Sequence, residues 1–197
     1  MTAMGLVRER VANLPERAFI RVADVPTAIQ GKNTGANEQA FSRLAKDGQI
    51  ARIAKGLYWK APKSRFGVVP PPRLEAALAI AADRAPGPSG PAAAAYLGLT
   101  TQIPAVQELA VIGRESTKFG ETVFHERVNP KRDGLNPAEI AVLEIARDRL
   151  RYCETGRNQT VARLRDLAER GAINLDQIKK AAAGERRIVQ DFVALIV

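Results

Sequence analysis

A helical stretch that runs directly into a hairpin is the feature that most restricts the fold of this chain. Three apolar residues recur at helical spacing and a glycine ends the pattern: Ala40, Phe41, Leu44 and Gly48. Two short runs rich in β-branched and aromatic residues follow, at 49–53 and 57–60, with Gly56 between them. A glycine in that place is typical of a tight turn. The sequence therefore predicts a helix over 35–47 and then a two-stranded hairpin.

The residues before that helix extend the arrangement. Apolar spacing predicts a helix over 5–14 and a short extended piece at 19–20. Asp24 is expected to cap a second helix over 25–30. The resulting order is helix, strand, helix, helix, hairpin, which is the order of a winged helix-turn-helix. We therefore predict a winged-helix domain over residues 1–62.

The rest of the chain has a different composition. The proline-rich segment 63–72 is expected to be a semi-rigid linker. Ala-rich helical patterns dominate 73–197, with two candidate strands at 106–112 and 122–128. The expected helices are 74–84, 91–97, one begun by Asn136 and Pro137, 161–168, 175–182 and 188–196. The predicted class is mainly α (α+β): a winged helix followed by an α-rich domain with a small sheet.

Positive charge is concentrated in the first domain. The whole chain has 30 Lys and Arg against 21 Asp and Glu. Residues 1–66 hold 12 basic and 5 acidic residues, whereas 67–197 hold 18 and 16. A basic module is the electrostatic footprint of a protein that binds a polyanion. The distribution favours nucleic-acid binding, although basic charge also serves solubility alone.

The same composition argues against several other classes. One Cys, Cys153, excludes a disulfide framework and a multi-Cys zinc site, and one His, His125, excludes a His-rich metal centre. No nucleophile elbow or phosphate-binding loop is present. We therefore expect no enzyme, no cofactor and no metal. The sequence shows no signal peptide and no run of apolar residues long enough for a membrane span, so it predicts a cytoplasmic protein.

The outward face of helix 35–47 and the hairpin supply the candidate DNA contacts. Gln39 and Arg43 are expected to read bases, because Gln pairs with adenine and Arg with guanine in a bidentate fashion. Ser42 is expected to contact a base edge or a phosphate. The remaining candidates are Lys46 on the helix, Lys32 and Thr34 before it, and Arg52, Lys55 and Lys60 on the hairpin, the last five for phosphates. A solvated charged face is the alternative.

Other conspicuous residues receive structural interpretations. Tyr58 and Trp59 are neighbours on a strand, so they are not both expected in the core. The remaining expectations are a polar strand position for His125, an inert thiol for Cys153, and solvent exposure for most of Arg147, Arg149 and Arg151. A second basic surface stays open for Lys131–Arg132 and for Lys179–Lys180 with Arg186–Arg187.

Two segments resemble a known family. Residues 40–50 and 52–58 read AFSRLAKDGQI and RIAKGLY, which is similar to the winged helix of AbiEi-type antitoxins of type IV toxin–antitoxin systems. Residues 90–104, GPAAAAYLGLTTQIP, resemble a second and more specific signature of that family. The resemblance extends over roughly 17–195. This sequence departs from the family pattern at Phe41, which replaces the more usual Leu, and at Asn37, which occupies a position that is often apolar.

The resemblance implies a function. Such antitoxins bind inverted repeats in their own promoter and repress their operon, and their second domain counteracts a nucleotidyltransferase-like toxin without a stable complex. By position, Arg43 falls on the motif arginine of the recognition helix, and Arg52, Lys55 and Gly56 fall on the wing. A palindromic operator would call for two copies on DNA. The alternatives are a winged-helix regulator without a toxin, which the shortness of the chain leaves open, and a protein-interaction module.

Overall fold

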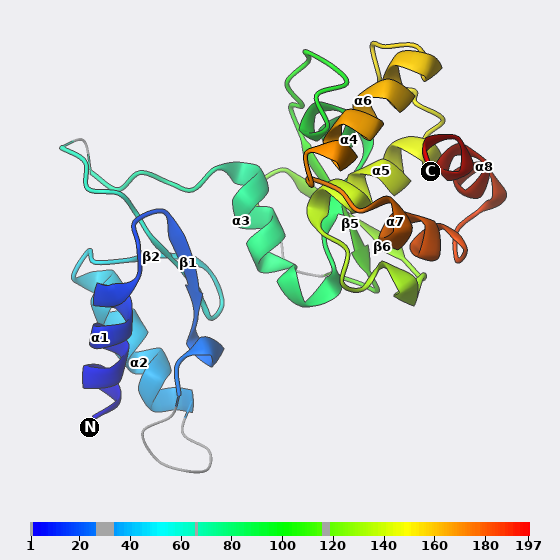
Figure 1. Ribbon diagram of the computed structural model, residues 1–197. Coiled ribbons are helices and arrows are strands. Elements are labelled where there is room, and N and C mark those ends of the chain that lie inside the picture. Colours follow the sequence, from blue (N-terminus) through cyan, green and yellow to red (C-terminus); the bar gives the residue numbers. More distant parts are fainter. Residues whose placement is uncertain (1, 27–33, 66, 116–118) are drawn as a thin grey trace. The chain divides into compact units, whose positions relative to one another are not determined.

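The computed structural model describes residues 2–26, 34–65, 67–115 and 119–197. The chain forms two compact units, Met1–Ile80 and Ala81–Val197 (Figure 1). Both units combine helices with a small sheet, so the predicted α+β class is confirmed. The predicted linker lies before α3, whereas the division between the compact units falls after that helix.

The first unit contains the predicted helix-and-hairpin order. Its elements are α1 (Ala3–Asn13), β1 (Ala18–Arg21), a 3-10 helix (Val22–Asp24), α2 (Thr34–Lys46), β2 (Ala51–Ala54), β3 (Leu57–Lys60) and α3 (Arg73–Ile80). The sheet is antiparallel with β3 in the centre, in the order β1-β3-β2. Phe41 and Leu44 of α2 and Val7 of α1 are completely buried. The ring of Phe41 stacks on that of Tyr58, with centroids 4.9 Å apart, which fixes α2 against the sheet.

The predicted helix over 25–30 is wrong where the structure describes it. Val25 and Pro26 are not helical, and 27–30 lie outside the described residues. The helical turn comes earlier, as the 3-10 helix Val22–Asp24. The Asp24 carboxylate accepts a hydrogen bond from the backbone N–H of Arg21 at 3.0 Å, so it closes the turn behind it instead of capping a helix ahead.

The second unit is built around a buried helix. Its sheet consists of β4 (Gly87–Pro88), β5 (Gln107–Ile112) and β6 (Thr122–Arg127), in that order, with β4 antiparallel and β6 parallel to β5. Its helices are α4 (Gly90–Tyr96), α5 (Pro137–Arg147), α6 (Arg157–Glu169), α7 (Leu175–Ala182) and α8 (Arg187–Ile196), with a 3-10 helix at Pro130–Arg132. The predicted helix over 74–84 divides into α3 and a 3-10 helix, Ala82–Arg84.

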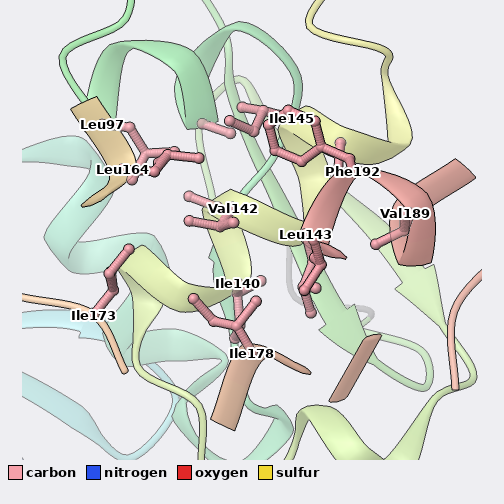
Figure 2. Packing of buried hydrophobic residues seen from close by; sticks show 14 of the residues in the cluster. Leu97, Ile140, Val142, Leu143, Ile145, Leu164, Ile173, Ile178, Val189 and Phe192 are labelled. Atoms are coloured by element: carbon pink, nitrogen blue, oxygen red, sulfur yellow. The ribbon is translucent and has the colours of Figure 1, made fainter. Parts of the chain in front are cut away.

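Local sequence explains why α5 forms and why it is central. Asn136 and Glu139 make the reciprocal capping box, at 3.0 and 2.8 Å, and Pro137 opens the helix. Every residue from Glu139 to Ala146 is buried. Figure 2 shows Ile140, Leu143 and other apolar side chains of α5 in one cluster with side chains of the surrounding helices. No helix within the described residues is long and apolar enough to cross a membrane.

Candidate nucleic-acid interface

Four polar side chains form a stripe along α2. Gln39, Ser42, Arg43 and Lys46 are spaced three, four and seven residues apart, which places them on one face of the helix, and all four are exposed. The opposite face packs into the core of the first unit through Ala40, Phe41 and Leu44. Within the described part of the chain, neither Arg43 nor Lys46 forms a salt bridge, so both cations are available to an external anion. We call these four residues the α2 stripe.

A short wing follows α2. Gly48, with φ of +71°, reverses the chain after the helix, and β2 and β3 are joined by the two-residue turn of Lys55 and Gly56. Gly56 adopts φ of +72°, a conformation that favours glycine. Arg52 and Lys55 are exposed, and the Nε of Arg52 donates a long hydrogen bond of 3.5 Å to the Ala54 carbonyl of the same strand. The wing therefore presents two cations close in sequence to the α2 stripe.

Lys60 has backbone partners at the end of α1, which speaks against the phosphate contact that the sequence predicts. Its Nζ donates hydrogen bonds to the carbonyl oxygens of Val11, at 2.8 Å, of Ala12, at 3.0 Å, and of Leu14. These carbonyls are at the end of α1, where backbone acceptors lack partners within the helix. Lys60 is therefore a side-chain cap that fastens β3 to α1.

Tyr58 and Trp59 are both buried, with 4% and 1% of their surface exposed. Strand alternation predicted that one of them would point away from the core, and it does, but another part of the chain covers it. The indole N–H of Trp59 donates to the carbonyl of Val69 at 3.0 Å, and its ring packs on Phe19 with centroids 4.7 Å apart. The predicted linker therefore covers Trp59 on the face of the β1-β3-β2 sheet that points away from the core.

Asn37 explains how the start of α2 is held. Its side chain is 1% exposed, and its Nδ2 donates to the carbonyls of Val25, at 3.1 Å, and Pro26, at 3.4 Å. This contact fixes the beginning of the helix to the segment that follows the 3-10 helix. In the sequence, Asn37 stands out only because it occupies a position that is often apolar in the family that the chain resembles. Lys32 and the side chain of Thr34 lie outside the described residues, so their predicted phosphate contacts stay predictions.

The second basic surface is wrong for Arg132. Arg149 and Arg151 are exposed, as expected for most of the three neighbouring arginines, whereas Arg147 is not. Arg132 is 1% exposed and binds Glu144 at 2.6 Å and Glu185 at 2.7 Å. Arg147 is largely buried and also binds Glu185. Burial alone would raise the pKa of Glu144, but hydrogen bonds from Arg127 and the charge of Arg132 lower it. These residues form a buried ionic cluster, and pairing explains why arginine is tolerated there.

The second sequence signature has a structural basis in the second unit. Its first half forms α4, and its second half is held by one carboxylate. Glu154 accepts hydrogen bonds from the Thr100 hydroxyl at 3.0 Å and from the Thr101 backbone N–H at 2.9 Å. The Thr101 backbone N–H, and after it the Thr100 and Thr101 hydroxyls, lower the pKa of Glu154. The adjacent threonines of the signature therefore fasten this loop to the segment between α5 and α6.

The remaining candidates carry no catalytic arrangement that we identify. His125 Nε2 lies 2.7 Å from the Glu108 carboxylate on the neighbouring strand, which agrees with a polar strand position. Cys153 is half-buried, and burial raises the pKa of its thiol to about 11, which makes it a poor nucleophile at neutral pH. Within the described residues, no group of three or more His, Cys, Asp and Glu is placed to hold a metal ion.

Comparisons with known proteins give little further information. No protein-family model matches the chain, and no curated protein sequence matches it. Among solved structures, the chain is similar to the Rv2827c protein from Mycobacterium tuberculosis. The match has 16% sequence identity and a TM-score of 0.44, and covers 98% of this chain and 74% of that one. A likeness of this size carries no argument about function.

Proposed function

We propose that the first unit binds double-stranded DNA, with α2 in the major groove and the wing beside the phosphate backbone. The single observation that carries the proposal is the α2 stripe, an exposed polar face on a helix that is fixed from behind by Phe41 and Leu44. A helix fits the major groove of B-DNA, and a rigid support holds its side chains in register with the bases.

Each side chain of the interface has a distinct chemical role in this proposal. Arg43 donates two hydrogen bonds to guanine, and Gln39 pairs with adenine, each contact being worth about 1–3 kcal/mol of discrimination. Ser42 binds a base edge or a phosphate. Lys46, Arg52 and Lys55 bind phosphates, which contribute affinity for any sequence and position the helix.

We further propose that the protein is a cytoplasmic antitoxin of the type IV class that represses its own operon and counteracts a nucleotidyltransferase-like toxin. Support comes from the resemblance of residues 40–58 and 90–104 to the two signatures of AbiEi-type antitoxins. Two copies would occupy the inverted repeats of the promoter, and no stable complex with the toxin is expected. A regulator without a toxin would share the DNA chemistry and lack only the second activity.

A reporter gene under the control of the protein's own upstream region tests the repressor role. We expect expression of the protein to lower reporter output, Arg43→Ala to restore it, and Arg10→Ala, which removes an exposed cation on α1, to leave repression intact. Co-expression with a nucleotidyltransferase-like gene from the same operon then tests the antitoxin role. Rescue of growth by Arg43→Ala would show that toxin neutralisation is independent of DNA binding, whereas repression without any rescue would favour a plain regulator.

A further inference from the structure

A groove in the second unit lies between the end of α5 and one face of α8. It has a volume of about 690 Å³, within the range of pockets that bind ligands. Its apolar lining comes from Leu150, Ile188, Phe192 and Leu195. Phe192 and Ile188 continue into the core cluster around α5, and Figure 2 shows Phe192 with the other side chains of that cluster. Leu195 is 42% exposed, so the groove presents an apolar side chain to solvent.

The turn that forms one wall of the groove is strained. Arg149 and Leu150 follow α5 with φ of 55° and 60°, a region that residues other than glycine rarely adopt. The strained backbone is held by hydrogen bonds from Arg149 N–H to the Ala146 carbonyl and from Leu150 N–H to the Ile145 carbonyl. Backbone strain at a solvent-facing turn is more common at functional sites than elsewhere.

The rim of the groove is basic. Arg149 and Arg157 are both exposed, and neither forms a salt bridge with any residue that the structure describes. The acidic residue on the rim, Asp191, is paired with Arg187 at 2.7 Å. An apolar floor with unneutralised arginines above it is complementary to a surface that carries large apolar side chains flanked by carboxylates.

We propose that this groove binds an acidic amphipathic segment of a partner protein. Apolar side chains of the segment would cover Leu195 and Phe192, and its carboxylates would bind Arg149 and Arg157. A second copy of this chain fits less well, because a two-fold contact through the groove would bring the same basic rim from each copy together. Nucleic acid would match the arginines but would leave the apolar floor without a partner.

The proposal is independent of DNA binding, because every residue that lines the groove belongs to the second unit. A fluorescent peptide of about 15 residues, with leucines at helical spacing and glutamates elsewhere, is titrated with the full chain. A peptide with lysine at each glutamate position is the matched probe. Leu195→Asp and Arg149→Glu alter the floor and the rim. Lys131→Glu makes the same charge change at an exposed residue outside the groove.

We expect the acidic peptide to bind at least about tenfold more tightly than the lysine peptide, and each groove variant to weaken it by about tenfold or more. Lys131→Glu should retain the affinity, and circular dichroism should show that all variants fold. Equal binding of the two peptides, no binding of either, or an equal loss in Lys131→Glu would overturn the proposal. So would displacement of the peptide by a random DNA duplex, or a wild-type dimer in ultracentrifugation that Leu195→Asp converts to monomer.

Discussion

Lys60→Met distinguishes a lysine that caps a helix from one that binds DNA. The substitution removes a charged donor from three carbonyls at the end of α1. A hydrogen bond to a charged group contributes about 1.5–3 kcal/mol, and a cation at a helix C-terminus about 0.3–1 kcal/mol. Water replaces part of these bonds, because Lys60 is only half-buried. We therefore expect the first unit to lose about 1–2 kcal/mol of unfolding free energy.

Urea unfolding followed by tryptophan fluorescence measures this loss in the correct unit. Trp59 is the only tryptophan, and it is buried in the first unit. A unit of this size loses roughly 4–8 °C of Tm for each kcal/mol, so the effect is also visible by heating. The DNA affinity of Lys60→Met, corrected for the fraction of the protein that is unfolded, should depend on salt concentration as that of the wild type does.

Lys55→Met is the matched control, because Lys55 is exposed on the wing. It should leave the unfolding midpoint unchanged and reduce the slope of log affinity against log salt by about one. If Lys60→Met behaves in that way instead, its ammonium group binds a phosphate and the capping argument is wrong.

Three further perturbations test contacts that lie within one unit or the other. Trp59→Phe removes the indole hydrogen bond to the linker and should cost about 1 kcal/mol, measured by circular dichroism; no loss would mean that the linker is not held there. Arg132→Met removes an arginine that binds both Glu144 and Glu185, while Arg127 and Arg147 still bind these carboxylates, so it should cost about 1–3 kcal/mol in urea unfolding; a neutral effect would contradict the ionic cluster. The folded-state pKa values of Glu144 and Glu185 are lowered from 4.5, so their stabilisation is present above pH 4.5 and is lost as the pH falls through the lowered values. Unfolding free energies measured from pH 6 to pH 2 should therefore fall with decreasing pH in the wild type and less steeply in Arg132→Met.

The sequence predicted elements whose signals are local. Helix α2 carries its own apolar spacing and ends at a glycine with positive φ, and the capping box of Asn136 and Glu139 marks the start of α5. Both signals depend on contacts within a few residues, so neither requires knowledge of the fold. The side chains that the α2 stripe exposes follow from the same period.

Predictions failed where a distant segment decides the environment of a residue. Lys60 looks like a wing cation until α1 brings three carbonyls to it, 46 to 49 residues away in sequence. Strand alternation places only one of Tyr58 and Trp59 in the core, but the linker covers Trp59 as well. Arg132 is adjacent to an exposed lysine, yet Glu144 and Glu185 neutralise it in the interior. The charge of a residue and its place in a strand can be read from the sequence. Its burial also depends on tertiary contacts with distant segments.

The direct test of DNA binding is a fluorescence-anisotropy titration of the full chain with its own upstream duplex and with a scrambled duplex near physiological salt. We expect a preference for its own DNA of roughly a thousandfold or more, because specific recognition exceeds non-specific binding by at least that factor. Arg43→Ala should remove about 1–3 kcal/mol of that preference, whereas Arg10→Ala should keep it. Equal and weak binding to both duplexes, unchanged by Arg43→Ala, would contradict the proposed recognition by α2.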